Sequence, residues 1–190
     1  MAASTKLRKD AALNRARIVE VAETYLESGR QLQLNDIARE AGVGVATVYR
    51  HFPTPEALLE HLARPRMEEL EAAGLVALES GDLWRGLEGF LRLGLQAQLA
   101  DPALAAVLAA PEHADARTVE LVASLNSIAM RLVARVKAEG YLVEGLEGAD
   151  LFPLMCGVAY AARLGLAADP HDAGLADRFL DALLLGVRVR

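Results

Sequence analysis

The side chains best suited to chemistry in this sequence are crowded into one short segment, Ala41–Phe52, which reads AGVGVATVYRHF. Its second half presents two hydroxyl groups, a guanidinium and an imidazole within five consecutive residues, 47–51. Hydroxyls and cations of this kind bind phosphate groups, and small apolar side chains can contact the methyl groups of bases. By residue type alone, the segment fits the edge of a strand, a phosphate-binding loop or the second half of a DNA-reading motif.

The spacing of three small or branched residues separates these alternatives. Ala38, Gly42 and Val48 stand four and then six positions apart. In a helix-turn-helix, a small residue lets the two helices cross closely, a glycine takes the positive φ of the turn, and a branched apolar residue packs into the crossing. A phosphate loop fits less well, because no Lys-Ser/Thr pair follows the glycines and no strand precedes them. The pattern therefore predicts a helix-turn-helix whose second helix is Gly44–Phe52.

That arrangement leaves one face of the second helix exposed. Ile37, Ala41 and Val43 complete the buried side, and the residues that point away from the core are Gly44, Val45, Ala46, Thr47, Tyr49, Arg50 and His51. Small apolar groups near the helix start can meet thymine methyls, while the hydroxyls and cations can bind phosphates. Tyr49 could instead be a packed aromatic and His51 an ordinary surface histidine. The DNA-binding interpretation depends on the packing pattern, the exposed face and the local charge occurring together.

Charge is distributed unevenly along the 190 residues, whose formal net charge is −6. Residues 1–66 contain ten Lys and Arg against eight Asp and Glu, a net +2, so residues 67–190 carry a net −8. The start is more basic still, with only Asp10 opposing Lys6, Arg8, Lys9, Arg15 and Arg17. This basic arm indicates a polyanionic partner, although basic residues near a terminus can also serve only to keep it solvated.

Helical periodicity dominates the rest of the sequence. The first apolar stripe ends at Ser28-Gly29 and consists of Ile18, Val21, Ala22, Tyr25 and Leu26. Further helices are expected at Leu34–Ala41, Gly44–Phe52, from Pro55 onward, and at Leu83–Ala100, Pro102–Ala109, Arg117–Glu139, Asp150–Leu166 and Ala173–Val187. Pro65 lies inside the helix that starts at Pro55 and predicts a kink or break near His61–Arg64. Hydrophobic residues make up 53% and aromatics only 5%, which together with the absence of strand-like alternation predicts an all-α fold.

Several classes of protein fit the composition poorly. Cys156 is the only cysteine, so no intrachain disulfide can form. The start of the chain lacks the apolar run of a signal peptide, and the longest uncharged apolar run, Leu151–Ala162, is too short to cross a bilayer. The four histidines share no metal-ligand spacing, and no nucleophile–base arrangement can be recognised. We expect a cytoplasmic protein that is not an enzyme and holds no metal or cofactor.

The block from Arg15 to Leu62, RARIVEVAETYLESG…LQLNDIAREAGVGVATVYRHFPTPEALLEHL, resembles the DNA-binding domain of the TetR family of bacterial repressors. The DIAREAGV and TVYRHF parts are highly specific. The resemblance implies an all-α homodimer, with an N-terminal three-helix helix-turn-helix DNA-binding domain (1–53) followed by a helical-bundle effector-binding and dimerisation domain (54–190). Binding of a small effector would move the two DNA-reading heads and lower the affinity for the operator.

The resemblance also assigns roles by position. Base contacts fall on Asn35, Val45 and Ala46, and contacts with the DNA backbone fall on Gln33, Thr47, Tyr49 and His51; Gly44 and Arg50 complete the expected DNA-binding set. Three positions depart from the family pattern. Gln33 is a weaker N-cap than the usual Ser or Thr, Gly44 replaces a Ser that would cap the second helix, and Pro55 replaces a phosphate-binding Lys. The segment GVGVATVYRHFPTPEAL resembles one subgroup of the family.

Residues of the C-terminal part suggest an effector pocket and a dimer contact. Pockets combine apolar walls with a few polar groups, so the effector-binding candidates are Trp84, Phe90, Gln96, Asn126, Met130, Met155 and Tyr160. For any one of them, membership of the core is the simpler interpretation. The last two predicted helices are apolar on nearly all sides and need a second partner to bury them. The expected dimer interface contains Gly157, Ala161, Gly165, Phe179 and Leu183.

Two functions from different classes remain open. One is a ligand-responsive regulator, a repressor by analogy, which binds an inverted-repeat operator in double-stranded DNA as a homodimer. The other is a sensor or interaction module of the same fold without sequence-specific DNA binding. Thr47, Tyr49 and His51, together with the basic arm, favour the regulator.

Overall fold

The computed structural model describes residues 2–189 and, for side chains, residues 9–189. Over that range the chain forms α1 (Ala2–Glu27), α2 (Leu34–Glu40), α3 (Val45–His51), α4 (Pro55–Leu78), α5 (Leu83–Ala100), α6 (Pro102–Ala109), α7 (Ala116–Ala138), α8 (Gly148–Ala168) and α9 (Leu175–Val187). The only strand-like pairing within these residues is an isolated bridge between Leu142 and Arg188. The expected all-α fold is confirmed, and the predicted bounds of the last five helices lie within two residues of the observed ones.

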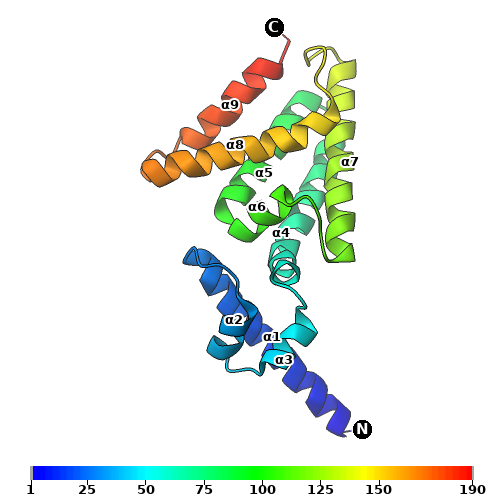
Figure 1. Ribbon diagram of the computed structural model, residues 1–190. Coiled ribbons are helices and arrows are strands. Elements are labelled where there is room, and N and C mark those ends of the chain that lie inside the picture. Colours follow the sequence, from blue (N-terminus) through cyan, green and yellow to red (C-terminus); the bar gives the residue numbers. More distant parts are fainter. Residues whose placement is uncertain (1, 190) are drawn as a thin grey trace.

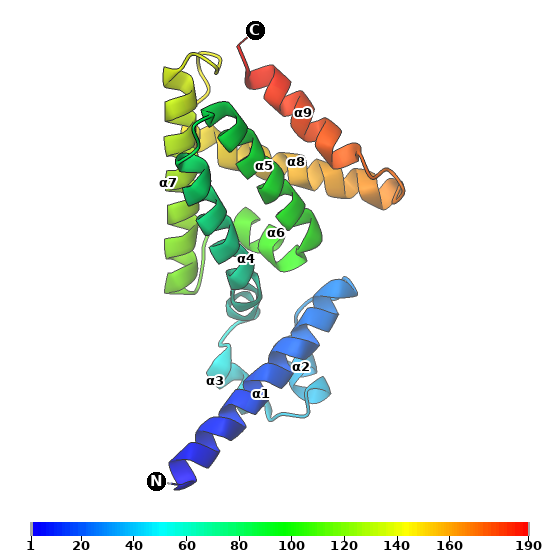
Figure 2. The ribbon, with the colours of Figure 1, turned by 180° about the vertical axis from the view of Figure 1, so that it is seen from behind.

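The helices form a small N-terminal head and a larger body. Figure 1 shows α1–α3 at one end of the molecule and α5–α9 at the other, with α4 leading from the head into the body. The view from behind shows α5 and α4 side by side, with α8 crossing α5 and α9 lying at the outer edge (Figure 2). The described chain therefore begins in the head and ends at the far side of the body.

Side-chain caps explain why several helices begin where they do. Thr54 Oγ1 accepts a hydrogen bond from the backbone N–H of Ala57 (3.1 Å), as its position before Pro55 predicts. Asp82, Asp101 and Asp115 cap α5, α6 and α7 in the same way, each accepting from one or two N–H groups of the first turn. These caps satisfy backbone N–H groups that have no partner within the helix. Because capping residues can be recognised locally, the first residues of these helices are predictable from the sequence.

A compact apolar core holds the head together. Its buried members come from α1 to the start of α4: Ile18, Ala22, Tyr25, Leu32, Leu34, Ile37, Ala38, Ala41, Val48, Phe52 and Leu58. Leu59 and Leu62 of α4 pack against both this core and the neighbouring core of the body. Because α4 belongs to both, the division between residues 53 and 54 stays a prediction.

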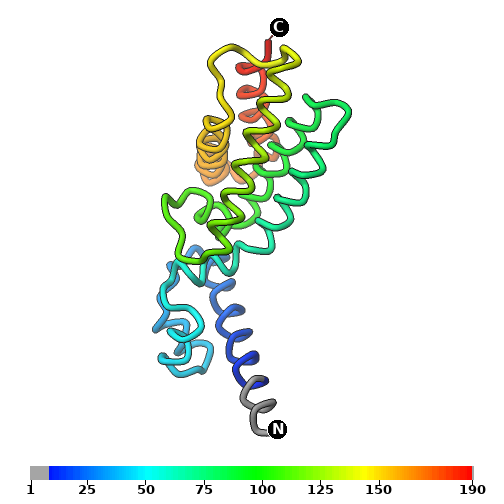
Figure 3. Tube along the Cα trace, turned by 90° about the vertical axis from the view of Figure 1, so that its right-hand side faces the viewer, coloured from blue at the N-terminus to red at the C-terminus, as the bar shows by residue number. Residues whose placement is uncertain are grey.

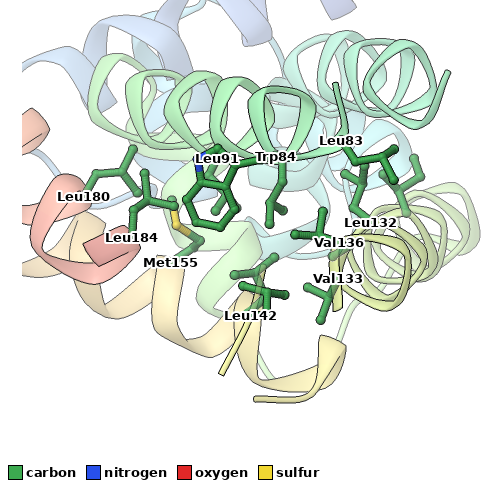
Figure 4. Packing of buried hydrophobic residues seen from close by; sticks show 14 of the residues in the cluster. Leu83, Trp84, Leu91, Leu132, Val133, Val136, Leu142, Met155, Leu180 and Leu184 are labelled. Atoms are coloured by element: carbon green, nitrogen blue, oxygen red, sulfur yellow. The ribbon is translucent and has the colours of Figure 1, made fainter. Parts of the chain in front are cut away.

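The body is built around a second set of apolar contacts. Figure 4 shows Trp84 and Leu91 of α5 gathered with Met155 of α8 and with Leu180 and Leu184 of α9. A further cluster joins α4, α6 and α7 through residues such as Met67, Leu104 and Leu121. Leucine, valine and alanine supply most of both clusters, as the low aromatic content predicts.

A buried carboxylate fastens the head-proximal part of α4 to the body. Glu60 is only 2% exposed, and its two oxygens accept hydrogen bonds from the backbone N–H groups of Ala114 (2.7 Å) and Asp115 (2.8 Å). One turn further along α4, Arg64 forms an ion pair of 2.9 Å with Asp115. The loop that precedes α7 is therefore held by two charged side chains of α4.

Pro65 does not break α4, which corrects part of the sequence prediction. The helix runs from Pro55 to Leu78 with Pro65 inside it. The proline removes one backbone donor, but Ala63 and Met67 on either side are fully buried and keep the chain helical. The trace nevertheless changes direction along α4, between its first turns beside the head and its remaining turns in the body (Figure 1, Figure 3).

The contacts of Glu60 predict a large loss of stability when its carboxylate is removed. Glu60→Ala would remove a buried acceptor and leave the N–H groups of Ala114 and Asp115 without it, so we expect the free energy of unfolding to fall by about 2–4 kcal/mol. Glu69→Ala is the matched control, since Glu69 lies on the exposed face of α4 and makes a surface ion pair with Arg66; its expected loss is below ~1 kcal/mol. Urea unfolding at one protein concentration measures both, and equal losses would contradict this role of Glu60.

Candidate nucleic-acid interface

The turn between α2 and α3 has the geometry that the sequence predicts. Gly42 has φ of +65°, a conformation that side chains disfavour, and the backbone N–H of Val43 bonds to the carbonyl of Ala38 (3.0 Å). A Cβ at Gly42 would meet nothing within 4 Å, so the glycine is required by backbone conformation rather than by space. Ala38 and Val48 are 1% and 0% exposed and hold the two helices together.

That packing leaves one face of α3 open to the surroundings. Val45 and Tyr49 are 47% and 46% exposed, and Ala46 is also exposed, whereas Thr47 is half-buried. Gly44 precedes the helix as its N-cap and provides no side-chain hydrogen bond, as its lack of a side chain predicts. This exposed face could meet base edges and phosphate groups without disturbing the core beneath it.

Two basic side chains at the end of α3 have different surroundings. The guanidinium of Arg50 folds back along its own helix, donating to the carbonyl of Ala46 and to Thr47 Oγ1, each at 3.2 Å. His51 is half-buried, and its ring lies 6.4 Å from that of Phe52. Both side chains lie at the surface of the head. The guanidinium of Arg50 must break its hydrogen bonds to Ala46 and Thr47 before it can bind an anion.

The predicted contacts outside α3 are exposed as well. Gln33 and Asn35 lie at the start of α2, where Gln33 is the N-cap and makes no capping hydrogen bond, as expected. Within the basic arm, Lys9, Arg15 and Arg17 are exposed on α1, whereas the side chains of Lys6 and Arg8 lie outside the described residues. Exposed cations are thus present on α1, which packs against α3.

A second polar cluster, not predicted from the sequence, joins the head to α4. Arg15 Nη2 lies 3.2 Å from His61 Nδ1, and the Arg15 guanidinium also lies over the Phe52 ring, 5.5 Å from its centroid. The rings of Phe52 and His61 are 5.4 Å apart. Burial, followed by the positive charges of Arg15 and Arg64, lowers the pKa of His61 below its ordinary value, while Asp115 acts in the opposite direction. A neutral imidazole suits the contact with Arg15, because its nitrogen can then accept a hydrogen bond.

The body contains a small apolar cavity of about 50 Å³ between α4, α5, α6, α7 and α8. Of the predicted effector-binding residues, Phe90 and Met155 line it, and Trp84 is buried in the core nearby. Gln96, Met130 and Tyr160 are exposed instead, and Asn126 is half-buried away from the lining. Gln98, which the sequence analysis missed, is the polar side chain at the cavity. It continues the buried stripe of Leu91 and Leu95 along α5, whereas Gln96 falls on the opposite face.

Helices α8 and α9 leave an apolar groove of about 580 Å³ lined by Pro153, Leu154, Gly157, Val158, Ala161, Phe179 and Ala182. The groove contains three of the predicted interface residues, Gly157, Ala161 and Phe179. Leu183 is half-buried and packs against the body core. Gly165 has a different role from the predicted one, because a Cβ at this position would overlap Leu175. Its small size lets the start of α9 approach α8 within one chain.

Two further observations concern metals and membranes. Among the residues that the structure describes, no group of three His, Cys, Asp or Glu side chains is placed to hold a metal ion. By length and composition α8 could span a membrane, with a mean hydropathy of 1.5 over its most apolar window, 22% of which is buried. The helix extends beyond the uncharged apolar run Leu151–Ala162 at both ends.

Comparison with known proteins shows which protein family the head resembles. Residues 28–62 match the family of bacterial regulatory proteins, tetR family. An HTH-type transcriptional regulator of Staphylococcus aureus (strain USA300) is 46% identical over 48 residues, which are 24% of this chain and 26% of that protein. The sequence match to this curated relative thus spans only about a quarter of its length.

Solved structures extend the likeness over the whole fold. A TetR transcriptional regulator from Streptomyces coelicolor is 28% identical, with a TM-score of 0.55, and the alignment covers 92% of this chain and 98% of that one. FadR from Bacillus subtilis in complex with stearoyl-CoA (18% identical, TM-score 0.62, 90% and 98% covered) and RolR in complex with resorcinol (22% identical, TM-score 0.61, 96% and 91% covered) share the fold. These findings support the TetR family for this chain, and the narrower subgroup stays a prediction.

The exposed face of α3 predicts two kinds of effect on DNA binding. Tyr49→Ala should weaken binding to all duplexes by about tenfold, because a contact with the DNA backbone carries no sequence information. Val45→Ser should instead change which duplex is preferred. Tyr141→Ala and Val76→Ser are matched controls at exposed positions of the body, 40% and 74% exposed. Fluorescence anisotropy at constant salt measures the affinities, and wild-type binding by Tyr49→Ala would disprove the placement of α3.

The lowered pKa of His61 predicts a pH-dependent stability. The folded protein binds fewer protons here than the unfolded chain, so the contribution of His61 is complete above about pH 6.5 and is lost as the pH falls below it. His61→Gln keeps an acceptor for Arg15 but cannot be protonated, and it should therefore reduce the loss of stability between pH 7.5 and 5.5. His171→Gln, at an exposed position, should leave the pH dependence unchanged. Parallel curves for wild type and His61→Gln in urea unfolding would refute this account.

Proposed function

We propose that this protein is a ligand-responsive transcriptional regulator, acting as a repressor, which binds an inverted-repeat operator in double-stranded DNA as a homodimer through α3. The observation that carries the proposal is the exposed face of α3. Val45 and Tyr49 are each nearly half exposed although Val48 between them is fully buried. A surface helix that exposes large apolar groups on one face has an unused contact surface. The tetR-family match over residues 28–62 supports DNA as the partner of that surface.

The distribution of charge supports the same partner. The exposed cations Lys9, Arg15 and Arg17 lie on α1, which packs against α3. Cations at these positions would bind phosphates and release counterions, whereas the net −8 of residues 67–190 would keep the body away from the duplex. Arg50 would exchange its bonds to Ala46 and Thr47 for a phosphate.

We place the dimer contact on α8 and α9. These two helices expose Leu154 (38%), which lines the apolar groove, and also Tyr160 (59%), Leu164 (57%) and Leu185 (75%). A two-fold dimer uses one such patch on each subunit and buries both at once. It would also present two copies of α3 to the same side, about 34 Å apart for successive major grooves.

The body is the proposed site of a small-molecule effector. FadR and RolR, which share the fold, are known in complex with stearoyl-CoA and resorcinol. These two ligands are chemically unrelated, so they support a ligand-binding body without identifying its ligand. The cavity beside Phe90 and Met155 is the site that we assign to the effector of this protein. We place the protein in the cytoplasm, as a regulator rather than an enzyme.

A selection from random DNA duplexes tests the proposal, with the purified full chain as bait and sequencing of the bound fraction. We expect an inverted repeat whose half-sites are about one helical turn apart. Ala161→Glu should yield monomers or aggregates that enrich no such repeat, because the charge enters the groove between subunits. Ala123→Glu, on the exposed side of α7, is the matched control and should behave like wild type.

The alternative function predicts a different result in the same experiment. A sensor or interaction module of this fold would bind duplexes only weakly and enrich no sequence. A wild-type protein that sediments as a monomer at micromolar concentration and still selects a defined operator would disprove the dimer. Wild-type dimers without any sequence enrichment would instead favour the sensor.

A further inference from the structure

The cavity in the body has an unusually uniform lining. Five helices contribute to it, and its lining residues are Leu70, Phe90, Leu91, Gly94, Gln98, Leu108, Leu125, Ala129, Leu151, Phe152 and Met155. None of these described residues carries a charge or titrates. Transferring an ionised carboxylate or ammonium into such surroundings without a counter-charge is strongly unfavourable. A molecule that occupies this cavity must therefore leave any charged group outside it.

Gln98 is the exception to the apolar lining. The side chain is 95% buried, since the residue is only 5% exposed. Its Nε2 donates one long hydrogen bond of 3.4 Å to the carbonyl of Gly94 in the same helix, and among the described residues its Oε1 receives no donor. An amide can donate two hydrogen bonds and accept two, and buried amides normally use most of that capacity. Because Gln98 lines the cavity, a molecule there can use this remaining capacity.

From these two observations we propose that the cavity takes a small, uncharged and largely apolar molecule with a single hydrogen-bonding group, which Gln98 recognises. This inference rests on the proposed function, because it names the ligand class for the effector site assigned above. A ligand hydroxyl can donate to Gln98 Oε1, and a ligand carbonyl can accept from Nε2. The apolar part of the ligand lies against leucine, phenylalanine and methionine side chains.

Size and access also restrict the ligand. The volume of about 50 Å³ would hold a few water molecules, at ~10–15 Å³ each, but it is about a third of the ~150 Å³ of a cavity that binds benzene. A ligand of benzene size must therefore move lining side chains or extend beyond the cavity. Phe90, Gly94 and Phe152, on α5 and α8, are the half-buried members of the lining, whereas the others are buried. A Cβ at Gly94 would meet nothing within 4 Å. Gly94 lines the cavity and has room for a Cβ, so a larger side chain at this position is the change chosen to obstruct it.

Four probes with the same number of non-hydrogen atoms test the hydrogen-bonding group and the charge of the ligand separately: toluene, phenol, pentanamide and pentanoate. Isothermal titration of the full chain at pH 7, without DNA, gives their dissociation constants. We expect phenol to bind about fivefold more tightly than toluene, because its hydroxyl reaches Gln98. Pentanamide should bind about a hundredfold or more tightly than pentanoate, because the carboxylate has no counter-charge in the cavity.

Two variants test whether Gln98 and the cavity itself cause these differences in affinity. Gln98→Leu should remove the preference for phenol over toluene while still binding toluene. Gly94→Leu should abolish the binding of all four probes, although the variant should fold at least as well as wild type, since leucine is a better helix former than glycine. Thermal unfolding of both variants without probes verifies that each is folded.

The outcomes that would overturn the proposal differ from those that would overturn the regulator. Equal affinities for pentanamide and pentanoate, an unchanged preference for phenol in Gln98→Leu, or no saturable binding of any probe at millimolar concentration would each refute the ligand class. The random-duplex selection uses protein without ligand, so its failure would remove the regulatory function and leave the ligand class standing. Release of the selected operator by phenol, but not by pentanoate, would support both.

Discussion

The buried carboxylate of Glu60 is the interaction on which the relation between the two parts of the molecule depends. It lies on α4, in the turns that also close the core of the head, and it accepts two backbone hydrogen bonds from the loop before α7. A charge buried this deeply is tolerated only when donors surround it. Because both donors belong to the body, the first turns of α4 cannot move relative to α7 without exposing or orphaning that charge.

The contacts next to Glu60 connect the same part of α4 to both the head and the body. Arg64 binds Asp115 in the same loop, while His61 faces Arg15 and Phe52 of the head. The same short part of α4 thus holds the body on one side and the head on the other. Farther along the helix, Leu70 lines the proposed ligand cavity. A ligand that shifts α4 at Leu70 would reach these contacts through the bend of the helix, and packed interfaces respond to such shifts in discrete steps.

The two surfaces proposed for partners differ in chemistry because their partners differ. The exposed face of α3 mixes small apolar groups with hydroxyls and cations, which suits base edges and phosphates. The groove of α8 and α9 is apolar, which suits a second copy of the same groove. The cavity in the body is apolar except for the amide of Gln98.

The sequence by itself determined the helices and the head, because these depend on local signals. Caps, prolines and the 3.6-residue period predict where helices begin and end, and the spacing of Ala38, Gly42 and Val48 predicts the crossing of α2 and α3. Only the tertiary structure decided which polar groups are used in the body. Gln98 rather than Gln96 faces the cavity, Glu60 meets a loop more than fifty residues away, and Gly165 accommodates Leu175 of its own chain. Such contacts join residues far apart in sequence, and their partners follow from the packing of whole helices rather than from any local pattern.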